Sequence, residues 1–340
     1  QPDKKEAPFP TATTMHRFAI RQTSSLSFAA ATTALRFQGT HFRNTTTPHP
    51  LGKEFKNPQP SSANDVPAAG EWENPIPHEV WTSEQLHAVK RTHRKPDCFL
   101  DYVAYGGVKT CRFVFDLLSG YFFGNLTERR ILRRFLFLET VAGVPGMVAG
   151  SLRHLASLRR MERDHGWIHT LTEEAENERM HMLTFMKVYE PATPLTGAAF
   201  RALVLIAQGI TWNVFFLCYL VSPRLCHRFV GYLEEEAVRT YSTVIEKMDS
   251  SDPRDAELHK FAKKPATDIA IQYWKLKDDA TMRDVVLAVR ADEANHREVN
   301  HTFAGMRPNE TNPFVETEDN GEKPASPKGQ TEDPTVVMSS

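Results

Sequence analysis

The chain has 340 residues, which suits one large domain or two smaller ones, and its formal net charge is −1. Without an excess of basic residues the composition gives no indication of nucleic-acid binding, and its 41% hydrophobic residues are ordinary for a folded protein. The four cysteines, Cys98, Cys111, Cys218 and Cys226, form no Cys-x-x-Cys pair. This argues against a structural zinc site and against a disulfide scaffold.

The N-terminal region has the composition of an organelle transit peptide. Between Met15 and Lys53 there is no acidic residue, whereas arginines lie among many Ser, Thr and Ala residues. We therefore predict a disordered N-terminus with a transit peptide over residues 1–53, with Met15 as a candidate start. The alternative is a plain disordered N-terminus. Residues 54–98 begin with many Pro, Asn and Ser residues and are predicted to form a linker and an N-terminal arm.

The central region, residues 99–306, shows helical hydrophobic periodicity and no alternating strand pattern, so the predicted class is all-α. The expected helices are longer than twenty residues, which favours a bundle. They cover residues 99–120, 127–156, 168–188, 195–221, 225–249 and 265–304, the last with a break near 278–281. Residues 307–340 are rich in Pro, Glu, Thr and Ser and are predicted to be disordered.

Two of these segments are unusually apolar. Between Phe135 and Leu152 the only charged residue is Glu139, and between Ala202 and Ser222 there is none. The second segment is long enough to span a bilayer. Two other interpretations remain open, a buried core helix and a helix that lies in the membrane interface with one face in lipid.

The motif with most chemical content is Glu-x-x-His on a helix, because residues three apart share one face. Two such pairs, with one Glu from each of two further helices, form the di-iron site of a four-helix bundle. Composition alone predicts roughly one pair by chance, so context must decide. The chain has five pairs: Glu84/His87, Glu162/His165, Glu178/His181, Glu293/His296 and Glu298/His301.

Two pairs lie on otherwise apolar helix faces. Glu178 and His181 are followed by Phe185 on their face, and Glu293 and His296 have a similar setting. Burying a carboxylate and an imidazole without a partner is costly, so we expect each pair to be compensated by mutual contact or by a metal. The other three pairs lie beside the Pro-rich linker, in a charged run, or about 140° around the last helix.

The single carboxylates are less sharply defined. Glu139 is alone in its apolar run, where a metal would compensate it, and the alternative is a protonated or helix-capping Glu. The second must come from Glu234, Glu235 or Glu236, and spacing leaves that choice open, although Glu234 shares a face with Tyr241. Carboxylates with two imidazoles and no thiolate suit iron or manganese.

Four stretches together resemble the alternative oxidase family over residues 99–306. They are LETVAGVPGM at 138–147, EEAENERMHML at 173–183, HRFVGYLEEEA at 227–237 and RADEANHREVNHTF at 290–303. The resemblance implies a ferritin-like di-iron four-helix bundle with two additional long helices and monotopic membrane association. It also implies a homodimer on the matrix face of the mitochondrial inner membrane, with Ala202–Ser222 in the interface and a mitochondrial transit peptide.

Residue by residue, the resemblance implies roles for matching positions. The two non-haem iron ions would be bound by Glu139, Glu178, His181, Glu234, Glu293 and His296, and Tyr241 would be the redox-active tyrosine. A supporting network would comprise Asn177, His227, Trp274 and Asp292. The quinol pocket would comprise Arg134, Leu138, Ala142, Glu236, Ala237 and Thr240.

The expected activity is oxidation of ubiquinol coupled to reduction of dioxygen to water, without proton pumping. Within the same chemistry, the alternatives are a plastid terminal oxidase and a quinone-ring hydroxylase. From other classes, the alternatives are a bundle that stores iron and a structural membrane bundle. Iron content and quinol-dependent turnover would discriminate among them.

Overall fold

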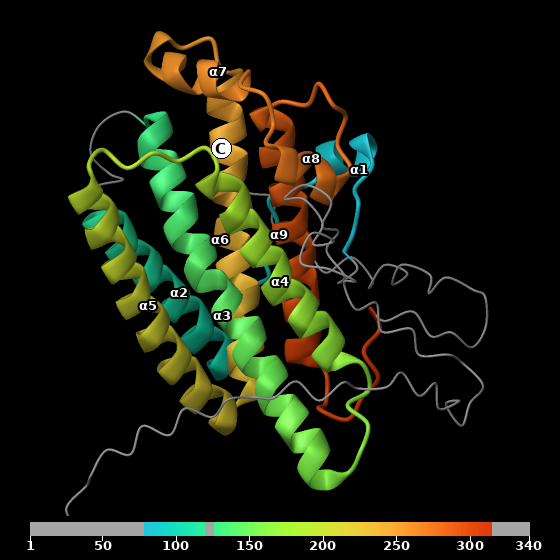
Figure 1. Cartoon of the computed structure of the whole chain (residues 1–340). Coiled ribbons are helices and arrows are strands. Elements are labelled where there is room, and N and C mark those ends of the chain that lie inside the picture. Colours follow the sequence, from blue (N-terminus) through green and yellow to red (C-terminus); the bar gives the residue numbers. More distant parts are fainter. Residues whose placement is uncertain (1–77, 120–125, 315–340) are drawn as a thin grey trace, which may run out of the picture. The chain divides into compact units, whose positions relative to one another are not determined.

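A computed structural model describes residues 78–119 and 126–314 (Figure 1). The predicted transit peptide, the linker up to residue 77 and the tail from residue 315 lie outside the described residues. Within the described ranges the elements are helical, and the one β-type pairing is an isolated bridge between Pro265 and Thr281. The all-α prediction is confirmed.

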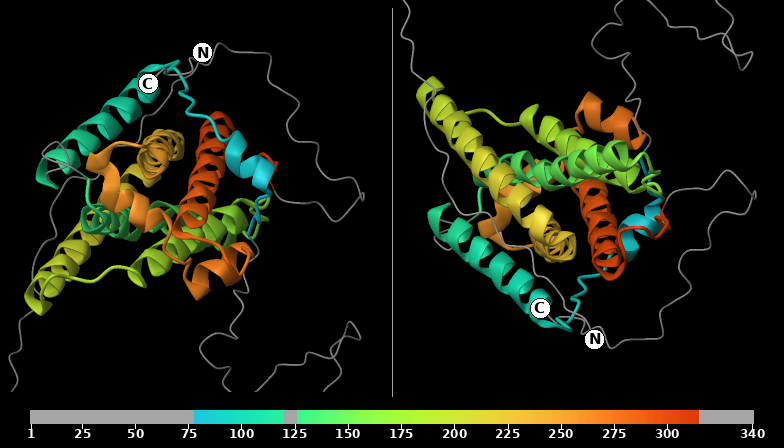
Figure 2. Two further views of the ribbon diagram at one scale, coloured as in Figure 1. Left: turned by 90° about the horizontal axis from the view of Figure 1, so that it is seen from above. Right: turned by 90° about the horizontal axis from the view of Figure 1, so that it is seen from below.

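Four long helices form the central bundle. α6 packs along α9 and α3 packs along α4, and Figure 2 shows these helices from both ends. Their bounds are α3 Glu128–Arg160, α4 Trp167–Met186, α6 Pro223–Asp249 and α9 Met282–Gly305. Two further long helices lie outside the bundle, as predicted: α2 (Phe99–Leu118) packs on α6, and α5 (Pro194–Val221) packs on α3 and α6.

Three of the long helices begin after residues whose side chains accept hydrogen bonds from free backbone N–H groups. Thr127 caps α3, Thr193 forms a capping box at the start of α5, and Ser222 caps α6. Proline follows the cap of both α5 and α6, where its missing N–H costs nothing. These local signals account for helix starts within a few residues of the predicted ones.

The structure differs from the predicted elements in three places. The short helices α1 (Ser83–Ala88) and α7 (Ala256–Ala262), with the 3-10 turn Pro253–Asp255, were missed because they are too short to show a period. α3 runs to Arg160 rather than residue 156. The break predicted near 278–281 is confirmed but begins earlier: α8 (Asp268–Trp274) ends where Lys275 adopts a left-handed conformation, and α9 begins at Met282.

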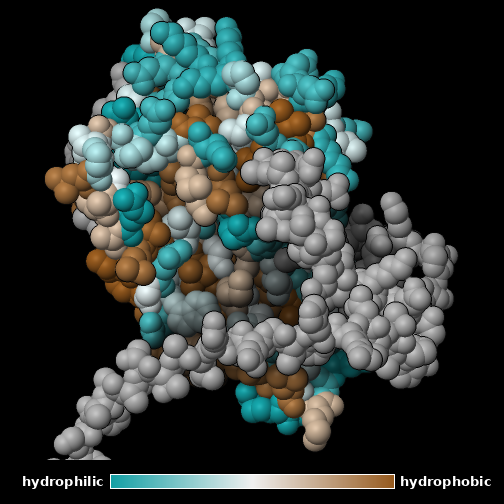
Figure 3. Space-filling model, viewed as in Figure 1, coloured by the Kyte–Doolittle hydropathy of each residue, from teal (hydrophilic) through white to brown (hydrophobic). Residues whose placement is uncertain are grey.

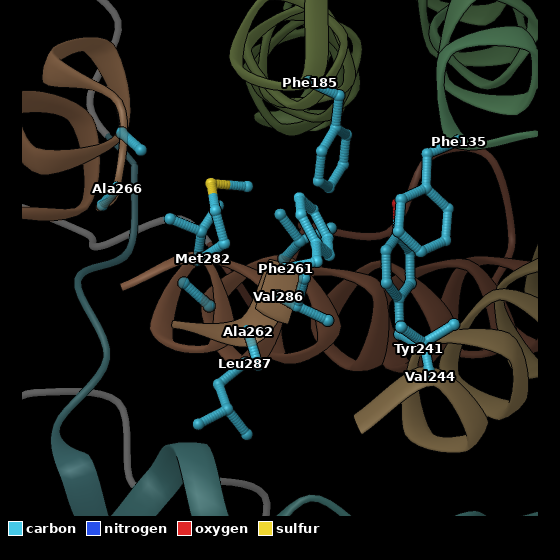
Figure 4. Packing of buried hydrophobic residues seen from close by; sticks show 14 of the residues in the cluster. Phe135, Phe185, Tyr241, Val244, Phe261, Ala262, Ala266, Met282, Val286 and Leu287 are labelled. Atoms are coloured by element: carbon cyan, nitrogen blue, oxygen red, sulfur yellow. The ribbon is translucent and has the colours of Figure 1, made fainter. Parts of the chain in front are cut away.

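The largest apolar cluster surrounds the N-terminal part of α9. Residues Val285–Val289 of α9 are all buried, which their uninterrupted apolar sequence requires of a central helix. Figure 4 shows Phe135 and Phe185 close to the ring of Tyr241. The Phe135 and Tyr241 ring centroids lie 4.5 Å apart, so core packing fixes the position of Tyr241.

α5 presents an apolar surface rather than a buried one. Only 11% of its most apolar 18-residue window is buried, against 44% for α3, and both helices are long and apolar enough to cross a membrane. The core-helix interpretation of Ala202–Ser222 is therefore wrong. Figure 3 shows apolar surface on the side of the molecule where α5 lies. Exposed large apolar side chains of α5 include Leu203, Leu205, Ile206, Ile210, Val214, Leu217 and Leu220.

The first residues after α9 are packed, although we predicted disorder from residue 307. Asn312 is 1% exposed, and its amide donates to the Thr170 hydroxyl at 2.7 Å and to the Gly166 carbonyl at 3.0 Å. Trp167 donates to the carbonyl of Glu310 at 2.8 Å. The start of α4, which has no side-chain cap, thus binds residues 307–314. The polar composition of this segment gave no sign of these contacts in the sequence.

Candidate metal centre

Four acidic and imidazole side chains meet in the centre of the bundle. One potential ligand atom from each lies within 4.8 Å of the others, and all four side chains are buried. They are Glu139 from α3, Glu178 and His181 from α4, and Glu293 from α9. His296 and Glu234 adjoin them: the Nδ1 atom of His296 lies 3.0 Å from Glu178, and Glu234 contacts Glu293. All six predicted ligand positions are therefore brought together.

In both Glu-x-x-His pairs of the cluster, the three-residue spacing places the Glu and the His on the same face of the helix. Within α4, Nδ1 of His181 lies 3.5 Å from Oε2 of Glu178. Within α9, Nδ1 of His296 lies 3.7 Å from Oε2 of Glu293. Each helix therefore presents one carboxylate and one imidazole on the same inward face.

Asp292 orients one of these imidazoles. Its Oδ2 atom lies 3.0 Å from Nε2 of His181 and also accepts from Trp274 at 2.8 Å and Asn177 at 3.1 Å. The Trp81 indole donates to its Oδ1 at 2.6 Å. Three of the four predicted network residues therefore meet here. Trp81 was missed, because nothing in the sequence links the N-terminal arm to a residue 211 positions later.

The cluster contains more carboxylates than cationic groups, so a bound cation would stabilise it. Burial, and then the charges of Glu293 and Glu178, raise the pKa values of Glu139 and Glu234 well above their usual range. Burial would raise the pKa of Glu178 too, but hydrogen bonds from His181 and His296 hold it well below its usual range. Four carboxylates are thus crowded around two imidazoles, a set that one or two hard cations would stabilise.

Two buried oxygens test whether these residues fit a metal. The Oε2 atoms of Glu178 and Glu293 have no hydrogen-bond partner in the described part of the chain. Buried carboxylate oxygens without a donor are costly, and coordination of a metal would satisfy both. Oxygen and imidazole donors without thiolate suit iron, so the residues fit the predicted di-iron centre.

Tyr241 contacts this cluster directly. Its hydroxyl donates a short hydrogen bond to Oε1 of Glu139 and is fully enclosed. Burial, and then the charges of Glu139 and Glu293, raise the pKa of Tyr241 well above its usual range. The phenol therefore keeps its proton at neutral pH and holds the Glu139 carboxylate from the α6 side.

The three consecutive glutamates of α6 have separate surroundings. Glu235 contacts His93 at 2.7 Å and His301 at 2.9 Å, so it belongs to a different polar group. Glu236 pairs with Lys109 of α2. Glu234 alone of the three lies against the ligand cluster, which answers the question that spacing left open.

The remaining Glu-x-x-His pairs lie away from the cluster. Glu84, His87, Glu162 and His165 are exposed, as the sequence context predicted. Glu298 points outward with 61% of its side chain exposed. His301, its partner in the motif, is buried against Gly231, where an added Cβ would come within 2.5 Å of the imidazole.

The predicted quinol-pocket residues lie on α3 and α6, and three of them, Arg134, Glu236 and Thr240, contact α2. Arg134 is 5% exposed, forms an ion pair with Asp116 at 2.5 Å and lies over the Phe115 ring. Arg112 donates to the Thr240 hydroxyl at 2.9 Å and contacts Glu236 at 3.2 Å. Half-buried Leu138, Ala142 and Ala237 complete the set. The contributions of Arg112 and Asp116 were missed because α2 carries no motif.

His227 belongs to a second network, separate from Asp292. Its Nδ1 lies 3.0 Å from the Asn300 side-chain oxygen, and its Nε2 lies 3.1 Å from the Tyr219 hydroxyl. Asn300 also donates to Glu174 at 3.1 Å. We expected one supporting network and the structure has two, because His227 lies two turns before Glu234 on α6.

Comparison with known proteins gives a consistent result. A family model described as "Alternative oxidase" matches residues 81–305. A protein of Emericella nidulans named "Alternative oxidase, mitochondrial" is 44% identical over 332 residues, covering 92% of this chain and 90% of that protein. Proteins with the same name from Trypanosoma brucei brucei and Yarrowia lipolytica are each 48% identical, covering 74% and 72% of this chain and 75% and 69% of theirs.

Proposed function

The chain belongs to the alternative oxidase family, and on that premise we propose that it is a ubiquinol oxidase that reduces dioxygen to water at a di-iron centre. The observation that carries the proposal is the enclosed cluster of four carboxylates and two imidazoles. Its relatives are named mitochondrial, and we place this activity at the matrix face of the mitochondrial inner membrane.

The six cluster residues would hold two iron ions. Bound iron would supply the reversible one-electron chemistry that quinol oxidation and dioxygen reduction require. The protein's own contribution is orientation: Asp292 fixes the His181 ring, and Tyr241 holds one oxygen of Glu139. A redox role for Tyr241 is supported by this direct contact with a ligand residue and by its enclosure.

The polar residues between α2, α3 and α6 would bind the quinol ring. Arg112, Glu236 and Thr240 are already joined by hydrogen bonds, and Arg134 is fixed by Asp116. Such a fixed group can bind hydroxyl and carbonyl oxygens without reorganising. Leu138 directly precedes Glu139 on α3 and Ala142 follows it three residues later, so both lie next to a ligand position, which supports a short path for electrons from the ring to the metal centre.

The exposed apolar faces support monotopic membrane association. α5 and α2 expose large apolar side chains, and such patches in a folded protein mark a lipid or protein contact. Because both faces lie on helices outside the bundle, we place them in one leaflet, with a homodimer as the functional unit. From the family resemblance we propose that quinol oxidation is not coupled to proton pumping.

Oxygen uptake tests this function. Membranes containing the chain should consume oxygen with a ubiquinol analogue in the presence of cyanide, and uptake should stop in Glu178→Ala. The matched control is Glu84→Ala, which changes the exposed member of another Glu-x-x-His pair and should leave uptake unchanged. Two bound irons per chain without quinol-dependent uptake would instead indicate an iron-binding bundle.

A further inference from the structure

A small cavity adjoins the ligand cluster between α3, α4, α5, α6 and α9. It has room for about one water molecule and is therefore too small for a quinol ring. Much of its lining is apolar or small, including Ala149, Leu171 and Phe215. Its polar lining consists of the ligand-cluster residues Glu178, Glu234 and His296 and, outside that cluster, Glu174, His227 and Asn300.

The second polar group is a directed chain of hydrogen bonds. The Asn300 amide donates to both carboxylate oxygens of Glu174, at 3.2 and 3.1 Å, so its oxygen is left to accept from Nδ1 of His227. Nε2 of His227 then accepts from Tyr219. Burial lowers the pKa of His227 to about 4, which agrees with a neutral ring. This chain fixes the Glu174 carboxyl group against the cavity.

Glu174 is a buried acid with no part in metal binding or quinol binding. It is 8% exposed, and no cation forms an ion pair with it in the described part of the chain. The charged or titratable groups that surround it are Glu173 and Glu178 of α4, His296 of α9, and His227 and Glu234 of α6. Burial raises the pKa of Glu174 to about 7, so both protonation states are accessible near neutral pH.

We propose that Glu174 is the proton relay to the metal centre, an inference that rests on the proposed oxidase function. The carboxyl O–H bond breaks as its proton passes through one water in the cavity, and a new O–H bond forms on the oxygen undergoing reduction. The electrons come from quinol and not from Glu174. The carboxylate regains its proton from solvent before the next turnover.

The direct test replaces the acid by its amide. Glu174→Gln keeps the size of the side chain and can still accept from Asn300, but it cannot release a proton. We expect kcat to fall by about 100-fold, with iron content and the quinol KM unchanged. Glu173→Gln is the matched control, because burial raises its pKa to about 7 as well, yet it does not line the cavity. Its kcat should equal that of the wild type.

A second measurement follows the protonation of Glu174 directly and does not require bound iron or turnover. Infrared titration of the iron-free protein should show carboxyl C=O absorption with a midpoint near pH 7 from both Glu173 and Glu174. Glu174→Gln should remove one component of it and Glu173→Gln the other, so that the double variant lacks both. If Glu174→Gln loses iron, the comparison of kcat between Glu174→Gln and the wild type is replaced by one between Glu174→Asp and Glu174→Asn. The turnover rate per bound iron should be higher in Glu174→Asp, which keeps an acid.

The outcomes separate the two proposals. A wild-type protein that takes up no oxygen with quinol contradicts the oxidase function itself. An active wild type whose Glu174→Gln variant turns over equally fast with full iron, or Asp and Asn variants with equal rates per iron, overturns the relay alone.

Discussion

The Nε2 atom of His181 lies 3.0 Å from Asp292, and this contact turns the other ring nitrogen toward the carboxylate cluster. Nε2–H donates to the Asp292 carboxylate, which leaves Nδ1, 3.2 Å from Glu139, as the ring nitrogen that would bind a metal. A carboxylate behind an imidazole sets both its tautomer and its orientation. Asp292 would therefore orient a metal ligand without being one itself.

We expect Asp292→Asn to weaken iron binding by about 10- to 100-fold, because the amide no longer fixes the His181 tautomer. Iron content after dialysis against a graded chelator measures this change. Asp268→Asn, at an exposed position on α8, is the control and should bind iron normally. Unchanged iron retention in Asp292→Asn would show that the tautomer is fixed in another way.

Removing the Tyr241 hydroxyl should separate catalysis from assembly. Tyr241→Phe keeps the ring contacts with Phe135 and loses the hydrogen bond to Glu139, which should cost about 1 kcal/mol of stability. If Tyr241 has a redox role, turnover should fall far more than this while iron content stays constant. Tyr232→Phe is the control, because that buried hydroxyl has no hydrogen-bond partner within the described residues.

The ligand cluster was predictable because most of its residues are identified by short sequence motifs. Each Glu-x-x-His pair fixes two side chains on one helix face, and Glu139 was conspicuous as the one charge in an apolar run. The choice of Glu234 required either the family resemblance or the structure, since adjacent residues on a helix differ only in direction.

The surrounding groups were not predictable from spacing, because they join distant parts of the chain. Trp81 reaches Asp292 across 211 positions, and Asn300 reaches Glu174 across 126. Asn312, in a polar stretch that resembled a disordered tail, is buried by its contacts with α4. A polar residue that becomes buried leaves no apolar period in the sequence.

Gly146 permits the close approach of α3 and α4 that brings Glu139 to Glu178. A Cβ there would lie 2.6 Å from the Leu171 carbonyl oxygen, which as backbone cannot move cheaply. Gly146→Ala should therefore destabilise the protein by about 1 to 3 kcal/mol in urea unfolding and reduce iron binding. At Gly106 on α2 nothing lies within 4 Å, so Gly106→Ala should be neutral or stabilising by up to about 1 kcal/mol.

The ionisation of Glu174 should appear in the pH dependence of stability. Burial raises its pKa from 4.5 to about 7 in the folded protein, so the wild type loses stability as pH rises between these values, relative to a variant without the acid. A shift of this size corresponds to about 3 kcal/mol. Urea unfolding of the iron-free protein measures this change. The free energy of unfolding of Glu174→Gln should increase relative to that of the wild type between pH 4.5 and about 7, and the difference should stay constant above pH 7. A difference between Glu174→Gln and the wild type that does not change with pH would mean that Glu174 is ionised at neutral pH.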